Sequence, residues 1–486
     1  MFSFSSIEEE IKKLPLKLFN TQSRKKETFL PLKNNCARIY TCGPTVYHFA
    51  HIGNYRTYIF EDLLRRTIKF FHMDILQVMN LTDVDDKTIK GATEKNITLD
   101  EFTKPYKDAF FEDLRTLHIE PVEHYPAATE YIGEMILFIK DLLEKKIAYK
   151  GADGSIYFSI NKFPRYGCLS QLKLDELQTG ASERINSDEY DKDCAADFVL
   201  WKAYNAERDG KIYWESPFGL GRPGWHIECS TMAMKLLGDT IDIHAGGVDN
   251  IFPHHENEIA QSEAHSNKIF SRLWLHSEHL IVDNKKMSKS LGNFYTLRNI
   301  LEKGYTGTQV RYLLLQTHYK TQLNFTLEGL SAAQASLERL QDFIFRLQNI
   351  VEQNSSSDRA YSLIEKAYFS FASALADDLN ISAALGALFT LVREINALCE
   401  QKNLSKQQAQ ATLTLLQKLN GILGIFSFEF EDQQIPEEIQ EALKQRLQAR
   451  KEKNWSRADE LRDYILKSGY LIEDTPQGAH LKKIHR

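Results

Sequence analysis

The chain has 486 residues, a hydrophobic content of 43% and a formal net charge of −6. This length predicts several domains, and the negative charge argues against a protein that coats nucleic acid along its whole surface. No apolar run of membrane-spanning length and no signal or transit segment is found, so we expect a cytoplasmic protein with no membrane partner. Six cysteines are too sparse for a disulfide framework, so we expect their thiols to be free or to bind metal.

The first predicted elements are a strand, a turn and a helix. Residues 37–41 (ARIYT) form a short apolar run, the turn begins at Cys42, and residues 55–71 carry apolar side chains at helical spacing. Residues 75–79 (ILQVM) and 240–243 (TIDI) predict further strands, so strands and helices alternate over about 320 residues. This alternation predicts an α/β fold with a doubly wound parallel sheet of the Rossmann type, which binds ligands at the carboxyl ends of its strands.

The character of the sequence changes along the chain, and four regions are expected. The Rossmann-type domain contains a proline-bearing polar stretch at about 120–193 that predicts an insertion, and beyond Thr326 the segments are amphipathic and predict a helical bundle. The tail from Glu441 has eleven lysines and arginines against seven acids, a local excess of four positive charges. The predicted regions are an N-terminal extension (1–31), the Rossmann-type domain (32–325), the bundle (326–430) and a small C-terminal domain (431–486).

Two histidines stand close to the predicted start of the first helix. His48 and His51 are three residues apart and precede Gly53. A helix start offers unpaired backbone N–H groups and a positive dipole end, which suits the phosphates of a nucleotide. An equally weighted alternative is that these histidines cap the helix or pack against it.

A second polar segment, residues 283–293 (DNKKMSKSLGN), carries Lys285, Lys286 and Lys289 among small residues. Ammonium groups on such a loop can close over a transferring phosphate and stabilise its charge. The alternative is a solvated run of surface charges. A histidine-rich turn followed more than 200 residues later by a lysine loop resembles the "HIGH" and "KMSKS" signatures of class I aminoacyl-tRNA synthetases.

The second signature occurs letter for letter at residues 286–290, whereas the first reads HIGN. Asn54 replaces the last histidine. Its amide can donate a hydrogen bond but cannot become a cation, so the role at this one position is left open.

A metal site is predicted from three separate segments. Cys42 lies in the turn at the end of the first strand, Cys229 lies in GRPGWHIECS, and His254 and Glu258 share a helical face in HHENE. Two thiolates, an imidazole and a carboxylate would hold zinc. The alternatives are buried cysteines that act as small apolar side chains, and His255 as the histidine ligand, since its i, i+3 spacing to Glu258 also places them on one face.

From about Leu32 to the C-terminus the motifs together resemble cysteinyl-tRNA synthetases of the bacterial type. These motifs are YTCGPTVY, NLTDVDDK, GRPGWHIECS, DIHAGGVDNIFPHHENEIAQSEA, KMSKSLGN, ARKEKNWSRADELRD and EDTPQG. The resemblance implies a ligase that activates L-cysteine with ATP and Mg²⁺ and transfers it to the terminal adenosine of tRNA(Cys), releasing AMP and pyrophosphate. It implies one zinc ion on Cys42, Cys229, His254 and Glu258, and a monomer is expected.

The resemblance also implies roles for individual residues. The residues at ATP are His48, His51, Asn54, Lys286 and Lys289, with His48, His51 and Lys289 catalytic. The residues around cysteine are Thr82, Trp225, His244 and Asp249, with Asp249 facing the ammonium group. The anticodon contacts are Arg450, Trp455, Asp459 and Asp474, although Trp455 could equally anchor the core of the C-terminal domain.

The need for zinc follows from the competing amino acid. Serine is nearly isosteric with cysteine, and shape alone separates such a pair by only about 1 to 3 kcal/mol. A metal that binds the substrate thiolate discriminates chemically, so no editing domain is expected. The alternatives are a cysteine ligase of the mycothiol type, which joins cysteine to an amino sugar and lacks the full C-terminal tail, and a non-catalytic RNA-binding paralogue.

Overall fold

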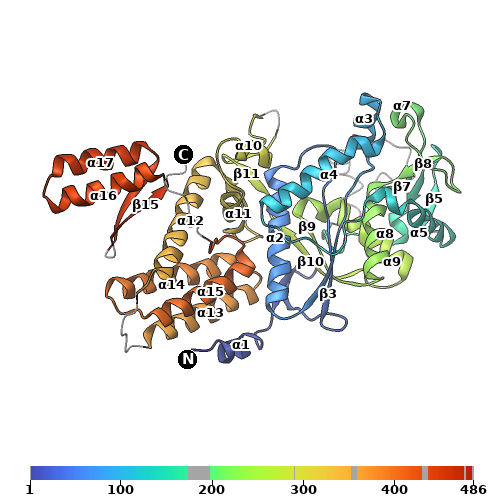
Figure 1. Ribbon diagram of the computed structural model, residues 1–486. Coiled ribbons are helices and arrows are strands. Elements are labelled where there is room, and N and C mark those ends of the chain that lie inside the picture. The colour runs from blue at the N-terminus through green and yellow to red at the C-terminus, as the bar shows by residue number, and fades with distance from the viewer. Residues whose placement is uncertain are drawn as a thin grey trace. The chain divides into compact units, whose positions relative to one another are not determined.

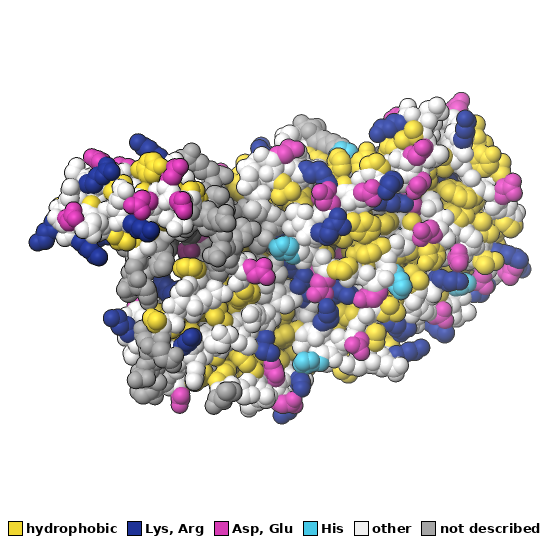
Figure 2. Space-filling view, in the orientation of Figure 1, with side chains coloured by type: hydrophobic (Ala, Val, Ile, Leu, Met, Phe, Trp, Pro, Cys, Tyr) yellow, Lys and Arg dark blue, Asp and Glu magenta, His cyan; other side chains and the backbone are white. Residues whose placement is uncertain are grey.

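A computed structural model (Figure 1) describes residues 2–172, 197–288, 291–351, 358–429, 436–475 and 478–483. The chain divides into two compact units, residues 1–426 and 427–486. On the face in Figure 2, basic and acidic side chains are interspersed over both units, in keeping with the small net charge of −6.

The core of the larger unit is a four-stranded parallel sheet with the order β10-β9-β3-β4. Its strands are β3 (Cys36–Thr41), β4 (Asp74–Met79), β9 (Ile241–Gly247) and β10 (Ser271–Ser277). Helix α2 (Ile52–Phe70) packs on one face and α8 (Trp225–Leu237) and α9 (Glu256–Ser266) lie on the other (Figure 1). Both faces of the sheet are therefore covered, and the predicted α/β doubly wound class is confirmed.

The remaining elements before the bundle surround this sheet. A second sheet is antiparallel, with the order β5-β6-β7-β8, and two of its four strands come after residue 193. Its strands are β5 (Ala148–Lys150), β6 (Ile156–Phe158), β7 (Phe198–Ala203) and β8 (Gly221–Pro223). The helices are α3 (Asp86–Lys95), α4 (Leu99–Thr116), α5 (Ile132–Glu144), α7 (Ala206–Asp209), α10 (Leu297–Leu301) and α11 (Gly307–Leu315), with short turns η1 (Ala128–Tyr131) and η2 (Ile160–Lys162).

A third small sheet, β12-β11-β13, follows the parallel one in the chain. It consists of β11 (Leu280–Val282), β12 (Lys285–Lys286) and β13 (Leu323–Phe325). β11 pairs with both partners, antiparallel to β12 and parallel to β13. The lysine loop therefore begins on a strand that is held by this sheet.

The N-terminal residues, which carried no assigned role, form helix α1 (Ser5–Ile11) and a hairpin of β1 (Lys17–Asn20) and β2 (Lys25–Thr28). The Phe2 ring stacks on Tyr361 of the bundle, with centroids 4.7 Å apart. The turn of the hairpin docks on β10, where the Thr21 backbone N–H donates to the Trp274 carbonyl at 2.8 Å. This segment is thus attached to both the bundle and the sheet.

The bundle consists of α12 (Leu327–Gln348), α13 (Arg359–Ala376), α14 (Ile381–Glu400) and α15 (Lys406–Leu423). Contrary to the sequence expectation, α14 is apolar and long enough to cross a membrane by length and composition. It packs on α13 with a buried apolar face, as a core helix of a bundle does. The buried Arg311 connects the bundle to α2, because its Nη2 lies 2.6 Å from Asp62 Oδ2 and its Nε donates to the Leu423 carbonyl at 2.6 Å.

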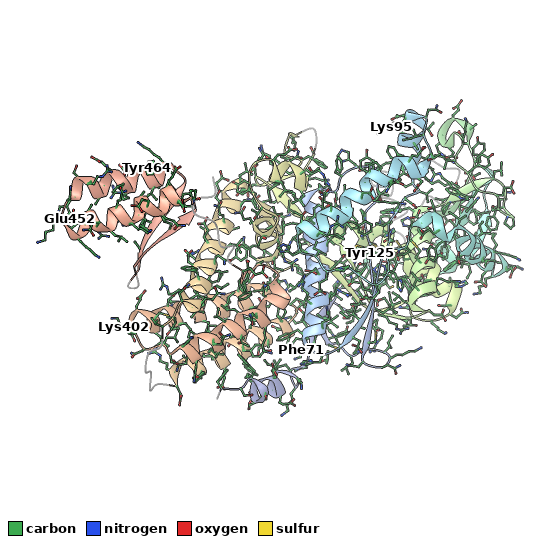
Figure 3. All side chains as sticks on the ribbon, in the orientation of Figure 1. Phe71, Lys95, Tyr125, Lys402, Glu452 and Tyr464 are labelled. Atoms are coloured by element: carbon green, nitrogen blue, oxygen red, sulfur yellow. The ribbon has the colours of Figure 1, made fainter. Side chains whose placement is uncertain are left out.

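The smaller unit contains two helices, α16 (Glu437–Lys451) and α17 (Trp455–Lys467), and a hairpin of β14 (Tyr470–Thr475) and β15 (Gly478–Lys483). Figure 3 places Glu452 at the end of α16 and Tyr464 on α17. Its core is small and consists of Ile439, Ala442, Leu461, Ile465 and Tyr470.

Candidate functional site

The candidate site lies where the strand order of the parallel sheet reverses. β4 lies on one side of β3, and β9 and β10 lie on the other side. Residues that follow β3, β9 and β10 line a pocket of about 860 Å³, at the position where doubly wound sheets bind ligands. The predicted residues that line it are Cys42, His48, His51, Asn54, Trp225, Asp249 and Lys286.

His51 and Asn54 form the start of α2. His51 is the N-cap, and its Nδ1 accepts a hydrogen bond from the Asn54 backbone N–H at 3.1 Å. The Asn54 Oδ1 accepts one in return from the His51 backbone N–H, also at 3.1 Å, which completes a capping box. The capping box therefore gives Asn54 a structural role at this helix start, in addition to the contact with ATP that the resemblance implies.

The capping bond determines which nitrogen of His51 carries the proton. Because Nδ1 accepts, the neutral ring carries its proton on Nε2 and can donate there. Burial lowers the pKa of His51 to about 4, so the ring is neutral at pH 7. His51 thus offers the pocket a neutral N–H donor beside the positive end of a helix.

His48 has the opposite arrangement. Its Nδ1 donates to the Phe49 carbonyl at 3.1 Å, and its ring is nearly parallel to that of Tyr106. With Nδ1 protonated, Nε2 of the neutral ring is an acceptor, so His48 donates from Nε2 only as the imidazolium. The two histidines of the motif are therefore not equivalent as phosphate ligands.

The four predicted metal ligands converge next to this helix start. Cys42 follows β3, Cys229 lies on α8, and His254 and Glu258 come from the turn η4 (Ile251–His255) and the first turn of α9. Their ligand atoms all lie within 4.8 Å of one another. The cluster is almost entirely buried, so its polar atoms need partners inside the protein.

The chemistry of the cluster fits a soft divalent cation. Glu258 Oε1 is buried and has no hydrogen-bond partner among the described residues, although it lies 3.1 Å from His254 Nε2. The hydrogen bond with Cys229, together with burial, raises the pKa of Cys42 well above its ordinary value, and burial does the same for the pKa of Glu258. Thiolates and a carboxylate would be unfavourable together here unless a cation balanced them.

A second set of ligands, Cys42, His244, His255 and Glu258, meets the same distance limit. The two sets differ in whether the histidine nitrogen that does not face the metal has a hydrogen-bond partner. His254 Nδ1 lies 2.9 Å from His226 Nδ1, whereas His244 Nδ1 is buried without a hydrogen-bond partner in the described chain. Metal-ligating histidines nearly always have such a partner, so the first set fits better.

The turn after β3 is held by a residue that the sequence analysis missed. The Asn80 Oδ1 accepts from the Gly43 backbone N–H at 2.9 Å, and its Nδ2 donates to Thr82 Oγ1 at 3.0 Å. A Cβ on Gly43 would lie only 1.8 Å from the Asn80 carbonyl oxygen, so this position requires glycine. Asn80 opens the motif NLTDVDDK, but nothing in the sequence indicates that it contacts the turn after another strand.

The four residues predicted around cysteine fall into two groups. Trp225 and Asp249 line the pocket, and the Trp225 ring is 43% exposed and stacks on His254 with centroids 4.1 Å apart. Thr82 and His244 are buried and do not belong to the described residues that line it. Thr82 Oγ1 donates to Glu228 Oε2 at 3.2 Å and His244 Nε2 lies 2.9 Å from Glu258 Oε2, so both hydrogen-bond to buried carboxylates.

The lysine loop borders the same pocket. Lys286 on β12 and Met287 line it. Asn293 holds the start of the loop, since its Oδ1 accepts from the Ser288 backbone N–H at 2.9 Å and its Nδ2 donates to the Lys286 carbonyl at 3.2 Å. Lys289 lies outside the described residues, so its catalytic role stays a prediction.

Comparison with known proteins gives the family. The model of the class I (C) tRNA synthetase catalytic domain matches residues 28–335, the DALR domain matches 370–427, and the cysteinyl-tRNA ligase anticodon binding domain matches 432–481. A cysteine–tRNA ligase of Protochlamydia amoebophila (strain UWE25) is 65% identical over 476 residues, which cover 98% of this chain and 99% of that one. The chain belongs to the cysteine–tRNA ligase family.

Other members of the cysteine–tRNA ligase family are also close, such as that of Chlamydia felis (strain Fe/C-56), 56% identical over 96% of this chain and 98% of its own. Solved structures of lower identity share the fold. A methionyl-tRNA synthetase of Mycobacterium tuberculosis with methionyl-adenylate has a TM-score of 0.57 at 14% identity, covering 80% of this chain and 89% of that one. A leucyl-tRNA synthetase of Agrobacterium radiobacter K84 has a TM-score of 0.58 at 12% identity, covering 82% and 85%.

The predicted anticodon residues lie in the smaller unit, which matches the anticodon binding domain of the family. Trp455 begins α17, is 59% exposed and does not belong to the described core, which removes the alternative of a core anchor. Arg450 lies exposed on α16, and Asp459 pairs with Arg462 at 3.1 Å. Asp474 lies on β14, and its side chain is outside the described part of the unit.

Proposed function

We propose that this chain activates L-cysteine with ATP and transfers the cysteinyl group to the terminal adenosine of tRNA(Cys), releasing AMP and pyrophosphate. Family membership supports this reaction. The observation that carries it is the arrangement of one strand, turn and helix. Cys42 at the end of β3 belongs to the thiol, histidine and carboxylate cluster, and His51, nine residues later, caps the helix that borders the same pocket.

The cluster of Cys42, Cys229, His254 and Glu258 is assigned to one zinc ion. Two sulfur ligands, one imidazole and one carboxylate suit zinc, and His226 supplies the partner for the remaining nitrogen of His254. When bound, zinc would supply a soft Lewis acid for the thiolate of the substrate, which would separate cysteine from serine, whose hydroxyl is far less acidic.

The walls of the pocket would position the rest of the amino acid. Trp225 stacks on His254 and so lies beside the cluster, where its ring covers the short side chain of cysteine. The carboxylate of Asp249 faces the same pocket and pairs with the substrate ammonium group. Thr82 and His244 act from behind this wall by holding the buried carboxylates of Glu228 and Glu258.

In the activation step, the amino acid held beside the metal cluster reacts with the ATP held at the start of α2. The carboxylate oxygen of cysteine attacks the α-phosphorus of ATP, and the bond between that phosphorus and the pyrophosphate oxygen breaks. His51 donates its Nε2–H to the phosphates at the start of α2, His48 lines the same pocket, and Lys286 and Lys289 add positive charge, with Mg²⁺ accompanying ATP. These groups act by position and charge, because phosphoryl transfer needs little covalent work from side chains.

The adenylate then passes its acyl group to the 2′-hydroxyl of the terminal adenosine, as the class I relationship implies. Residues 431–486 are assigned to the anticodon, with Arg450 and Trp455 stacking on unpaired bases and Asp459 and Asp474 accepting hydrogen bonds from base edges. We also propose that the chain works as a monomer in the cytoplasm.

Cysteine-dependent exchange of labelled pyrophosphate into ATP tests activation, and charging of tRNA(Cys) tests transfer. We expect exchange with cysteine and none above background with serine at the same concentration. An amino sugar offered in place of tRNA should accept no cysteine. Zinc-loaded protein that shows no cysteine-dependent exchange would refute the proposal, and charging of the amino sugar alone would favour a ligase of the mycothiol type.

A further inference from the structure

The N-terminal hairpin makes a side-chain contact that its attachment to the sheet does not require. Beyond its backbone bond to Trp274, Thr21 places its Oγ1 2.7 Å from His276 Nδ1. Both side chains are buried. His276 is the last but one residue of β10, so this contact lies at the carboxyl end of the edge strand, where the pocket begins.

The contact is the first of three that lead to the metal cluster. His276 Nε2 lies 2.8 Å from His255 Nδ1, and His255 Nε2 lies 3.3 Å from Cys42 Sγ. Each ring nitrogen of both histidines is thereby used. A continuous chain of hydrogen bonds thus runs from the hairpin, through Thr21, His276 and His255, to the sulfur of Cys42.

The donors in this chain of hydrogen bonds can point in only two directions, either toward Thr21 or toward Cys42. Both rings are buried, and a neutral imidazole has one N–H and one lone pair to share between its two partners. In one direction Cys42 is an S–H donor and Thr21 accepts at the far end. In the other, Thr21 O–H donates to His276, His276 Nε2–H donates to His255, and His255 Nε2–H donates to the sulfur.

A metal-binding cysteine is a thiolate and accepts hydrogen bonds, so only the second direction is compatible with a bound metal. In that direction the hydroxyl of Thr21 satisfies Nδ1 of His276. Without this donor the lone pair of a buried nitrogen would be left unpaired, and the opposite tautomers would turn a lone pair of His255 toward the thiolate.

We propose that Thr21 is a positioning residue of the metal site, whose hydroxyl keeps the N–H of His255 directed at the sulfur of Cys42. The inference rests on the proposed metal site and extends it to a segment outside the sheet. Outer partners of this kind orient metal ligands and tune their basicity. The N-terminal hairpin would then contribute directly to cysteine selection.

The hydroxyl is not what holds the hairpin in place. The Asn20 Oδ1 accepts from the Trp274 backbone N–H at 3.2 Å, and its Nδ2 donates to the Arg272 carbonyl at 3.2 Å. The Phe19 backbone N–H donates to Asp378 Oδ1 at 2.8 Å. Replacing the Thr21 hydroxyl with a methyl group therefore removes the hydrogen-bond donor and leaves these other attachments intact.

The test compares Thr21→Val with Thr21→Ser in the full chain. Thr28→Val, the same change at an exposed position of the same hairpin, is the matched control. Zinc affinity is measured by competition with a chelator, and Co²⁺-loaded protein reports the metal–thiolate bonds through its charge-transfer absorption. We expect Thr21→Val to bind zinc about ten- to a hundredfold more weakly with an altered cobalt spectrum, and Thr21→Ser and Thr28→Val to match wild type.

A zinc affinity equal to that of wild type and an unchanged cobalt spectrum in Thr21→Val would overturn the inference. So would a loss of zinc affinity in Thr21→Ser as large as that in Thr21→Val, because it would point to packing of the methyl group. A wild-type chain that binds no metal would instead refute the metal site itself. If Thr21→Val does not fold, His276→Gln and His276→Leu provide the same contrast. Glutamine can still donate to His255 and should retain zinc, leucine should lose it, and equal affinities would overturn the inference.

Discussion

The capping box at the start of α2 allows the structural and chemical roles of Asn54 to be separated. Asn54→Ala removes the oxygen that accepts from the His51 backbone N–H, whereas Asn54→Asp keeps an oxygen there and adds a negative charge. Both changes lie in the wall of the pocket that we assign to the phosphates of ATP. The two variants should therefore fail in different assays.

The expected magnitudes follow from the geometry. Loss of the one hydrogen bond that the Asn54 side chain adds to the capping box costs about 1 kcal/mol, which is roughly a fivefold change in an opening equilibrium. The backbone amide of His51, which donates to Asn54 Oδ1, should exchange about fivefold faster with solvent in Asn54→Ala and at the wild-type rate in Asn54→Asp. A carboxylate about 6 Å from a phosphate charge is repelled by about 3 kcal/mol at an effective dielectric constant of about 20, and by less where water enters. The KM for ATP should thus rise about tenfold or more in Asn54→Asp.

Hydrogen exchange measured by mass spectrometry on peptides that span residues 45–60 gives the first quantity, and pyrophosphate exchange at varied ATP gives the second. Asn54→Ala should raise the KM for ATP by less than Asn54→Asp, at most about tenfold, because it removes one neutral hydrogen bond and adds no charge. Faster exchange in Asn54→Asp would contradict the capping role of the side-chain oxygen. An unchanged KM for ATP in the same variant would show that this helix start does not face the phosphates.

Three further predictions concern separate parts of the molecule. Cys229→Ser should lose most of the bound zinc measured by metal analysis, whereas Cys36→Ser, outside the cluster, should retain it; equal zinc in both would remove Cys229 from the site. Burial lowers the pKa of His51 from 6.5 to about 4, so the unfolded chain binds more protons between these values and stability is lost as the pH falls from 6.5 toward 4. Relative to His51→Gln, wild type should lose about 2 kcal/mol more unfolding free energy between pH 7 and pH 5, and parallel pH profiles would contradict the burial argument. Trp455→Ala should raise the KM for tRNA about tenfold or more by removing one stacked base, with pyrophosphate exchange unchanged; an unchanged KM would exclude stacking at this exposed ring.

The strand, turn and helix of the site could be predicted from sequence because their periodicities are local. The predicted strand at residues 37–41 lies within β3, but α2 begins at Ile52, three residues before the apolar spacing that starts at Tyr55. The cause is the reciprocal bonding of His51 and Asn54, which satisfies the first amides of the helix without an apolar side chain. Apolar periodicity therefore locates a helix but not its first turn.

The spacing of residues in the sequence was not enough to predict which histidine belongs to the metal cluster. His254 and His255 both have helical spacing to Glu258, yet the regular helix α9 begins only at Glu256 and both histidines belong to the irregular turn η4. That turn brings His254 Nε2 to 3.1 Å from Glu258 and His255 Nε2 to 3.3 Å from Cys42, so both rings contact the cluster. Contacts such as that of Asn80 with Gly43 join separate strands and have no local signal.

The short connection between Cys42 and His51 also limits the length of the substrate. Cys42 is attached to β3 and His51 to α2, and the turn between them is held to β4 by Asn80, so the distance from the sulfur ligand to the phosphate donor cannot adjust freely. Homocysteine would present the same thiolate to the metal, but its extra methylene would carry its carboxylate past the α-phosphorus by about one carbon–carbon bond. A displacement of about 1 Å can cost a hundredfold in rate, so this fold would select the chain length of the amino acid as well as its sulfur.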